Sequence, residues 1–540
     1  MQNFDIDALP VGYSNFELLR KENQIYVDKT DLIYSFTKKR GTGFLSRPRR
    51  FGKSLLSTTL KSLFEHGLEY FDGLKINDLW HDKTYPVLYL NFAIFDLFNV
   101  KLFSERLITE LNNFIEKYNI NLKPFSSRKD PKISLNLLLD KLDGEMVVII
   151  DEYDAAFSAN LDNPKVFEQY RKLLFLFFQV LKNRSDKFRF IFLTGVARFS
   201  NTSIFSGFNN FDDLCFMQKY SSLVGFTEEE IDKYFYPFLE KAAKNLDLSV
   251  SDLKQNLKNY YDGYSFDEKA QVHVYNPWSI LNFLKYSERG LIPYWTGAGF
   301  STLVVNYFKN KFIDANKDHV FNPLLDNYLI DYDELTSSQD LNNLSIILML
   351  YQSGYLTIDS VSGNIYTLRF PNFEINRYMA SFFINNVLCY NKLINKPNFP
   401  VGFYKQVIDS LVNQSAEEIK ESFGKILNYI SYSSNIFNDE ISVRDIISMG
   451  LSFLGIINEY ERQSAKGRCD LVIKFSKVSF AFEFKVARNG DDEEKLLNEA
   501  IEQIIDRKYM VDFTTEKLVR VAIVESAEKH EFTKCKVSCK

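Results

Sequence analysis

Residues Gly43–Ser54 read GFLSRPRRFGKS, an apolar stretch that leads through a basic loop into the start of a helix. A strand, a glycine-containing loop and a helix in this order are typical of a phosphate-binding loop. Gly52 would allow close approach of the backbone, Lys53 can reach the β- and γ-phosphates, and the Ser54 hydroxyl can ligate Mg²⁺. The standard motif has another glycine where this chain has Arg47. Taken alone, the stretch also fits a solvated basic surface.

A second apolar run, Met146–Ile150, ends in two acidic residues. Continuous apolar runs of this length are expected for strands buried on both faces of a parallel sheet. Acids at the carboxyl end of such a strand lie where α/β sheets bind ligands. We therefore expect Asp151 to hold Mg²⁺ through water and Glu152 to polarise an attacking water.

A third apolar run, Phe188–Leu193, is followed by Thr194 and, shortly after, by Arg198. Thr194 is expected to sense a γ-phosphate and Arg198 to contact it. Arg49 and Arg50 can line the phosphates, act as a finger donated to a neighbouring subunit, or pair with acids on a lid. The alternative for all three strands is a doubly wound domain whose strand ends carry ordinary charges.

The C-terminal part contains two further strand patterns, Gly467–Ile473 and Val478–Val486. A hairpin between them would bring Asp470 beside Glu483, with Lys485 on the same face as Glu483. Two carboxylates and a lysine on one side of a sheet can hold Mg²⁺ and activate water against a phosphodiester. The alternative is a surface hairpin with unremarkable charges.

Six separated motifs in the N-terminal half occur in the order of a known family. They are YVDKT at 26–30, RPRRFGKS at 47–54, IDEYD at 150–154, TGV at 194–196, SIFSGFNN at 203–210 and GFTEEE at 225–230. With the Asp470…Glu483-Phe-Lys485 pattern, the chain resembles the predicted AAA-ATPase-like family that carries a C-terminal PD-(D/E)XK nuclease domain. The resemblance implies a Walker-type ATPase core, with residues 26–30 near the nucleotide base or the domain entrance.

The same resemblance implies further residues for the nuclease site. Glu440, at the start of a helix that ends at Gly455, is the best match for a metal-binding glutamate, and Glu459 and Glu461 are competitors. Gln503, on a helix after the second strand, would face the active site. In this interpretation Asp470 and Glu483 bind Mg²⁺, while Lys485 stabilises charge and orients water.

The expected fold is α/β: a P-loop, AAA-like parallel sheet core, a helical middle region and an α/β nuclease-like domain. We place these at residues 1–235, 236–410 and 411–540. Just before the middle region, Thr227 and Glu230 predict a capping box, and within it Asn276 followed by proline predicts a helix start. The aromatic residues at 260–266 can stack bases, although core packing is the favoured interpretation.

Composition sets limits on location and partners. The 540 residues carry a net charge of −5, so any nucleic-acid site must be local. The five cysteines show no zinc-binding spacing, which favours reduced thiols. The N-terminus lacks the features of a signal peptide, and the longest apolar run, at 173–181, is too short to span a membrane. We expect a protein of the bacterial cytoplasm.

The sequence thus predicts an enzyme that binds and hydrolyses ATP with Mg²⁺ and cuts nucleic acid, DNA in the first instance, with homo-oligomerisation possible. One rival is an ATP-dependent regulatory switch whose nuclease-like domain only binds DNA or protein. Another is an ATP-dependent remodeller of protein substrates.

Overall fold

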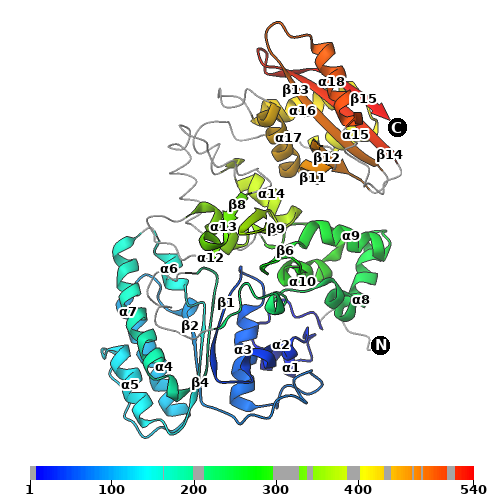
Figure 1. Cartoon of the computed structure of the whole chain (residues 1–540). Helices are drawn as coiled ribbons and strands as arrows, with labels where there is room; N and C mark the ends of the chain where they lie inside the picture. The colour runs from blue at the N-terminus through cyan, green and yellow to red at the C-terminus, as the bar shows by residue number, and fades with distance from the viewer. Residues whose placement is uncertain are drawn as a thin grey trace. The chain divides into compact units, whose positions relative to one another are not determined.

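The computed structural model describes residues 8–161, 163–198, 212–295, 328–336, 345–382, 384–385, 402–430, 440–464, 467–475, 478–506 and 517–539 (Figure 1). The chain divides into two compact units. The N-terminal unit comprises residues 1–304 and 327–372, and the C-terminal unit comprises residues 305–326 and 373–540. The boundaries expected at residues 235 and 410 remain predictions.

The N-terminal unit is built on a parallel five-stranded sheet with the order β2-β3-β4-β1-β5. The strands are β1 (Gly41–Ser46), β2 (Val87–Asn91), β3 (Met146–Asp151), β4 (Phe188–Gly195) and β5 (Asp212–Asp213). Every residue of β3 and β4 is buried, as their continuous apolar sequences require. Because β4 lies between β1 and β3, the carboxyl ends of all three strands meet at one edge of the sheet.

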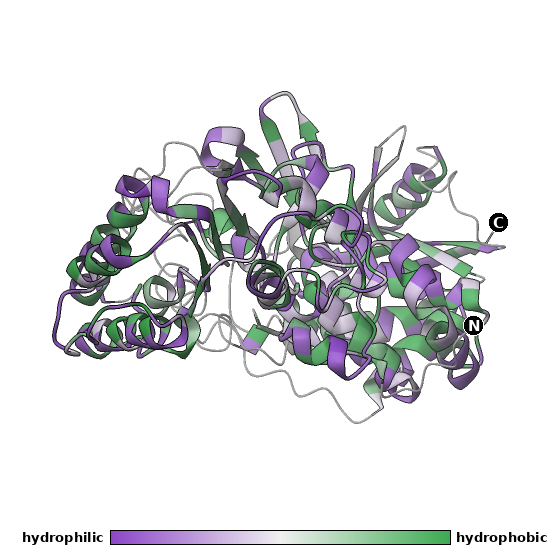
Figure 2. Ribbon diagram, turned by 90° about the horizontal axis from the view of Figure 1, so that it is seen from below, coloured by the Kyte–Doolittle hydropathy of each residue, from purple (hydrophilic) through white to green (hydrophobic). Residues whose placement is uncertain are grey.

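Helices connect and cover these strands. They are α1 (Phe16–Lys21), α2 (Thr30–Thr37), α3 (Lys53–His66), α4 (Val100–Lys117), α5 (Pro131–Lys141), α6 (Ala155–Ala159) and α7 (Pro164–Asn183). Figure 2 shows helices along which hydrophobic and hydrophilic residues alternate, as expected for helices with one buried face. The apolar run at 173–181 lies within α7 and is largely buried, so the expected buried helix is confirmed.

The rest of the N-terminal unit combines helices with short strands. They are α8 (Glu228–Asn245), α9 (Val250–Tyr261), β6 (Tyr264–Ser265), β7 (His273–Val274), α10 (Pro277–Lys285), β8 (Tyr328–Asp331), α12 (Tyr332–Thr336), α13 (Ile346–Ser353), β9 (Thr357–Ser362) and β10 (Ile365–Arg369). Thr227 and Glu230 form the capping box, and Asn276 caps α10 ahead of Pro277. Tyr260, Tyr261 and Tyr264 are buried, which agrees with the core-packing interpretation.

The C-terminal unit contains a five-stranded sheet with the order β11-β12-β13-β14-β15, in which only β13 and β14 are parallel. Its strands are β11 (Asn458–Ser464), β12 (Gly467–Lys474), β13 (Val478–Ala487), β14 (Lys517–Ser526) and β15 (Glu531–Cys539). Its helices are α14 (Phe373–Phe382), α15 (Phe403–Val412), α16 (Ala416–Ile430), α17 (Glu440–Leu454) and α18 (Glu493–Asp506).

The two faces of this sheet differ in chemistry. Phe480, Phe482 and Phe484 stack along one face of β13, and the ring of Phe423 on α16 lies 5.2 Å from that of Phe482. The opposite face is covered by α18, whose Ala500 packs with alanine and valine side chains of β13 and β14. The alternation predicted from the sequence is confirmed, and it leaves the side chains of Glu483 and Lys485 on the α18 side.

Two expectations about the chain's environment can be compared with the described residues. None of the helices in these ranges has the length and apolar character of a membrane span. Of the five cysteines, the four within the described ranges have free thiols. Cys389 lies outside those ranges.

Candidate nucleotide and metal sites

The loop between β1 and α3 ends in a left-handed glycine. Gly52 has φ 97°, a conformation that side-chain-bearing residues rarely adopt, and it stands at the N-cap of α3. The turn allows the 14-residue helix to begin at Lys53, directly at the carboxyl edge of the sheet. The first backbone N–H groups of a helix carry partial positive charge, so this end of α3 is suited to a phosphate group.

Lys53 is buried beside this helix start. Its Nζ donates to the carbonyl oxygen of Pro48 at 3.0 Å and lies 3.9 Å from Glu152 Oε1. Glu152, which follows β3, has φ 54°, a strained conformation that tends to occur at functional sites. The ammonium group is therefore held at the loop, with only a long ion pair to its nearest carboxylate partner among the described residues.

A cavity of about 340 Å³ extends from the phosphate loop into apolar surroundings. Its lining includes residues of the phosphate loop and a neighbouring acid, namely Arg50, Gly52, Lys53, Ser54 and Glu152. It also includes a set of apolar side chains: Ile25, Val27, Leu223, Val224, Phe226, Trp278 and Leu281. A polyanion site joined to an apolar slot matches the two halves of a nucleotide, the phosphates and the base.

Asp151 and Thr194 lie at the ends of adjacent strands, and both are fully buried. Tyr89 donates to Asp151 Oδ2 at 3.4 Å, whereas Asp151 Oδ1 and Thr194 Oγ1 have no hydrogen-bond partner within the described ranges. Burial raises the pKa of Asp151, and interactions with Ser54 and Lys53 oppose that rise. A buried carboxylate oxygen without a partner, close to a serine hydroxyl, is a donor set that fits Mg²⁺.

The three predicted phosphate-contacting arginines are placed differently. Arg50 lines the cavity, and its guanidinium lies 3.9 Å from the centre of the Trp278 ring. Arg49 is exposed, and its carbonyl accepts from the Trp295 indole at 3.2 Å. Arg198 forms an ion pair with Asp213 on β5 and is not among the residues that line the cavity. Of the three side chains, only that of Arg50 lines the nucleotide cavity.

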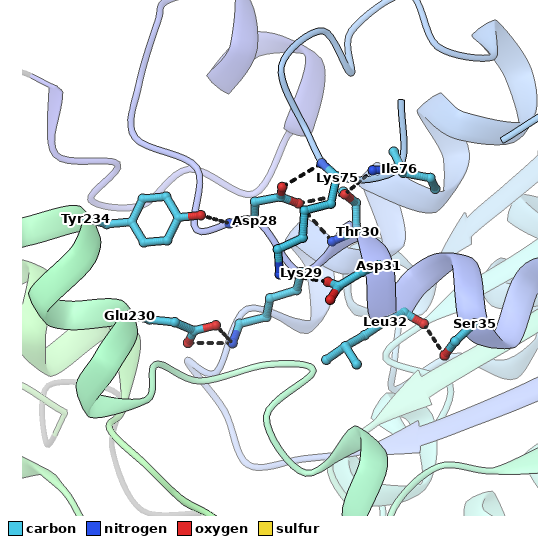
Figure 3. A network of polar contacts seen from close by, with 10 residues as sticks. All are labelled: Asp28, Lys29, Thr30, Asp31, Leu32, Ser35, Lys75, Ile76, Glu230 and Tyr234. Atoms are coloured by element: carbon cyan, nitrogen blue, oxygen red, sulfur yellow. Dashed lines mark hydrogen bonds and ion pairs between the residues drawn. The ribbon is translucent and has the colours of Figure 1, made fainter. Parts of the chain in front are cut away.

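The segment at residues 26–30 forms one wall of the cavity through a polar network (Figure 3). Lys29 Nζ donates to both carboxylate oxygens of Glu230 at 2.7 Å. The same glutamate accepts from the backbone of Thr227 in the capping box of α8. Asp28 accepts from Lys75 N and from Thr30. The network ties the wall to α8, since the hydroxyl of Tyr234 on that helix also accepts from the backbone N–H of Asp28.

In the C-terminal unit, Asp470, Glu483 and Lys485 come together as the hairpin predicts. Asp470 Oδ2 accepts from the backbone N–H of Phe484 at 2.9 Å, which anchors it to β13 next to Glu483. Glu483 is 2% exposed, its Oε1 lies 3.8 Å from Lys485 Nζ, and it also accepts from the side-chain amide of Gln503. Gln503 reaches Glu483 from α18, the helix that covers this face of the sheet.

The additional acids implied by family resemblance are not all described. Helix α17 begins at Glu440, but the side chains of Glu440 and Glu461 lie outside the described residues, so their metal roles stay predictions. Glu459 is paired with Lys474 at 2.6 Å. Within the described part of the chain, no group of three or more histidine, cysteine or acidic side chains is arranged to hold a metal. Asp470 and Glu483 are a pair of neighbouring carboxylates, a donor type that suits Mg²⁺.

Comparisons with known proteins divide the chain in the same way. A family model described as "Predicted AAA-ATPase" matches residues 10–205, and one described as "PD-(D/E)XK nuclease superfamily" matches residues 439–534. The "Uncharacterized protein in vnfD 5'region" of Azotobacter chroococcum mcd 1 is 30% identical over 518 residues, which cover 93% of this chain and 92% of that protein. The chain belongs to the family that joins a predicted AAA-ATPase domain to a PD-(D/E)XK nuclease superfamily domain.

Membership in this family confirms the resemblance inferred from the sequence motifs and the expected fold class. It supports a chain that carries an ATPase-like domain and a nuclease-like domain. Proteins with such domains generally use a nucleotide and Mg²⁺, and both predicted sites contain residues of the chemistry these ligands require.

Two residues of the candidate nucleotide cavity are not assigned to it by the sequence analysis. Trp278 and Phe226 are among the apolar residues that line the cavity. In the sequence, Phe226 belongs to the GFTEEE motif of the family, and Trp278 follows the predicted helix start at Asn276 and Pro277. Because both lie far along the chain from the phosphate loop, only the tertiary structure brings them to the nucleotide cavity.

Asp154, the last residue of the IDEYD motif, is a third feature that the sequence left unassigned. It accepts from the backbone N–H of Val196 at 3.1 Å and of Ala197 at 2.8 Å, which fixes the turn after Thr194. A Cβ at Gly195 would lie 2.3 Å from Asp154 Oδ1, so a glycine is required there. Burial, with a smaller contribution from Glu152, raises the pKa of Asp154 to about 6.

Proposed function

We propose that this protein binds and hydrolyses ATP in its N-terminal unit and cuts nucleic-acid phosphodiesters in its C-terminal unit, with DNA as the substrate to test first. The observation that carries the nuclease assignment is the convergence of Asp470, Glu483 and Lys485 on one side of the β12–β13 pair. Such a group is unusual on a buried sheet face unless it has a function, because burying several charges is costly.

In the ATPase half, the cavity accommodates the base at its apolar end and the phosphates at the start of α3. Lys53 neutralises the β- and γ-phosphates, and the helix N-terminus supplies backbone donors. Ser54 and Asp151 would hold Mg²⁺. Glu152 orients and polarises the attacking water, and Thr194, fixed by the turn that Asp154 holds, senses the γ-phosphate.

In the nuclease half, Asp470 and Glu483 would hold Mg²⁺, which when bound acts as a Lewis acid on the scissile phosphate and lowers the pKa of its water. Lys485 stabilises the negative charge that develops on the phosphate. Gln503 holds the Glu483 carboxylate in orientation through their hydrogen bond. In this proposal, nucleotide state controls when the nuclease acts, as a ligand-dependent shift between two states.

The partner is nucleic acid, recognised through its phosphates, and assembly of several copies remains part of the proposal. Arg49 is exposed on the phosphate loop and is available to a neighbouring subunit as a finger. Sedimentation of the full chain with and without ATP and Mg²⁺ measures its oligomeric state. A monomer under both conditions would argue against a finger supplied by another copy.

The central test incubates the purified full chain with Mg²⁺ or Mn²⁺ and single- or double-stranded DNA or RNA, with and without ATP. We expect metal-dependent cleavage that the Asp470→Ala variant lacks. Binding of DNA without cleavage under all conditions would favour the regulatory-switch alternative. ATP turnover that rises with protein substrates, and not with nucleic acid, would favour the remodeller.

A further inference from the structure

Arg47, which replaces the first glycine of the standard phosphate loop, does not line the nucleotide cavity. It is 2% exposed, and its Nη1 donates to the carbonyl oxygens of Ser46 and Cys215, both at 2.9 Å. Its guanidinium also lies 4.3 Å from the centre of the Phe266 ring. The Arg47 side chain is therefore held at the root of the loop, outside the nucleotide cavity.

This place is a second, much smaller cavity of about 20 Å³. Its lining comes from the loop root, the turn after β4, the segment after β5, and α13, and includes Arg47, Pro48, Arg198, Cys215, Tyr351 and Gln352. A cavity needs roughly 10–15 Å³ of probe-occupied volume to hold one water molecule. The space thus admits one small occupant and is too small for a phosphate group.

Two arginines that line this cavity carry buried donor atoms without hydrogen-bond partners in the described ranges. Arg47 Nε and Nη2, and Arg198 Nη1, are buried and have no hydrogen-bond partner in the described ranges. A buried donor left without an acceptor typically costs about 1–3 kcal/mol, more for a charged group. The missing component is therefore an acceptor that several guanidinium N–H groups can share.

The positive charge of Arg47 also lacks a carboxylate in direct contact. Arg198 is paired with Asp213, but no carboxylate within the described ranges lies within 4.0 Å of an Arg47 nitrogen. Burial raises the pKa of the Cys215 thiol to about 12, so a thiolate does not supply the counter-charge. The nearby Asp267 carboxylate already accepts from the backbone N–H groups of Lys269 and Val272. Asp213 and Asp267 attract the Arg47 charge only at longer range. A buried guanidinium without a directly bonded counter-ion is costly, and the Phe266 ring offsets only part of that cost.

We propose that the small cavity between Arg47 and Arg198 binds a single monatomic anion of the halide class, for which chloride is the natural occupant. The anion would accept hydrogen bonds from both guanidinium groups and neutralise the excess positive charge at Arg47. Since the next residue, Pro48, lines this cavity and its carbonyl accepts from Lys53, the anion would also stabilise the root of the phosphate loop. The site is independent of whether the nucleotide cavity binds ATP.

The direct test is a crystal of the full chain grown or soaked with sodium bromide. We expect an anomalous scattering peak within about 3.5 Å of Arg47 Nη2 and Arg198 Nη1, a distance typical of hydrogen bonds to large anions. A bromide-soaked crystal with only a water-sized, non-anomalous feature there, or with an empty cavity, would overturn the proposal.

A solution test compares thermal unfolding in sodium chloride and sodium gluconate at equal ionic strength. Gluconate is too large for the cavity, so we expect chloride to raise the unfolding temperature by about 2 °C or more through preferential binding to the folded state. The difference should disappear in Arg47→Gln and in Arg198→Gln but persist in Arg184→Gln, which removes an ion pair with Asp140 elsewhere. An equal chloride effect in the two cavity variants and in the control would contradict the site.

Discussion

The candidate site of the N-terminal unit and that of the C-terminal unit differ in how far their polar groups satisfy one another. Near the phosphate loop, Lys53 donates to the Pro48 carbonyl and has a long, 3.9 Å ion pair with Glu152, and Asp151 Oδ1 has no hydrogen-bond partner within the described ranges. In the C-terminal unit, Glu483 accepts from Gln503 and lies near Lys485, and Asp470 accepts from a backbone N–H. The first site needs a ligand to complete its interactions, whereas the second must exchange existing interactions for a ligand.

This difference has a physical consequence for binding. A cavity whose donors and acceptors are already oriented loses little free energy to rearrangement when a ligand enters. A carboxylate that already has protein partners must give up part of those interactions to coordinate a metal. We therefore expect nucleotide to bind the N-terminal unit readily and the C-terminal unit to need higher concentrations of Mg²⁺ or Mn²⁺.

The largest expected effect comes from Glu483→Gln. The variant keeps the shape of the side chain and its contact with Gln503 but removes the negative charge, so we expect metal-dependent cleavage to fall by about 10³-fold. ATP turnover should stay unchanged, because the residue belongs to the C-terminal unit. The measurement is the cleavage rate on labelled DNA over a range of Mn²⁺ concentrations.

Its matched control is Glu531→Gln, which removes an exposed carboxylate from β15 of the same sheet. The control should cleave at the wild-type rate. If Glu483→Gln cleaves as fast as the control, the group of carboxylates and lysine is only structural. The C-terminal unit would then have no metal site at Glu483 to compare with the N-terminal cavity.

Lys53→Ala tests the other half of the comparison. Removing the ammonium group takes away the main positive charge at the phosphate end of the cavity, so ATP turnover should fall by about 100-fold or more. The measurement is steady-state phosphate release. The cleavage rate without ATP should match the wild type, and any stimulation of cleavage by ATP should disappear.

Lys101→Ala, which changes an exposed lysine on α4, serves as the control for altered charge. Turnover by this variant should equal that of the wild type. If Lys53→Ala still hydrolyses ATP at the wild-type rate, the cavity described above is not the ATPase site.

Much of this arrangement could be predicted from the sequence because it depends on local patterns. The apolar run at 146–150 predicts β3. The alternation of residues around Phe482 predicts which face of β13 carries Glu483. Trp278 could not be assigned to the nucleotide cavity, because its approach to Arg50 depends on packing between segments that are distant in sequence. Arg198 illustrates the same limit, since its ion-pair partner Asp213 lies 15 residues further along the chain, and the sequence alone does not show that the two meet.

A third prediction compares two buried carboxylates on opposite faces of the same sheet. Glu525 on β14 is 3% exposed and lies between Val486 and Phe532, and its Oε2 has no hydrogen-bond partner in the described ranges. Burial raises its pKa to about 7. Because the folded-state pKa is raised, the stability that this group contributes is present below about pH 4 and is lost as the pH rises through 7.

We therefore expect Glu525→Gln to increase the free energy of unfolding by about 2–3 kcal/mol at pH 8 and to leave it nearly unchanged at pH 4.5. Urea unfolding at the two pH values provides the measurement, with Glu531→Gln as the exposed control. Cleavage should be retained, since Glu525 lies on the face opposite Glu483. A variant that is less stable than the wild type at pH 8 would show that the carboxylate has a partner when charged.

The smallest expected effect concerns the capping box that supports the cavity wall of the N-terminal unit. Thr227→Ala removes the side-chain cap of α8, which accepts from Glu230 N at 3.3 Å, and should lower the free energy of unfolding by about 1 kcal/mol. The control, Ser249→Ala, removes the cap of α9, which accepts from Asp252 N at 3.0 Å, at a similar cost. Only Thr227→Ala should also weaken nucleotide binding a few-fold in titrations with a fluorescent ATP analogue, because Glu230 holds Lys29 in the cavity wall. Equal nucleotide affinity in the two variants would mean that this network stabilises the fold without shaping the site.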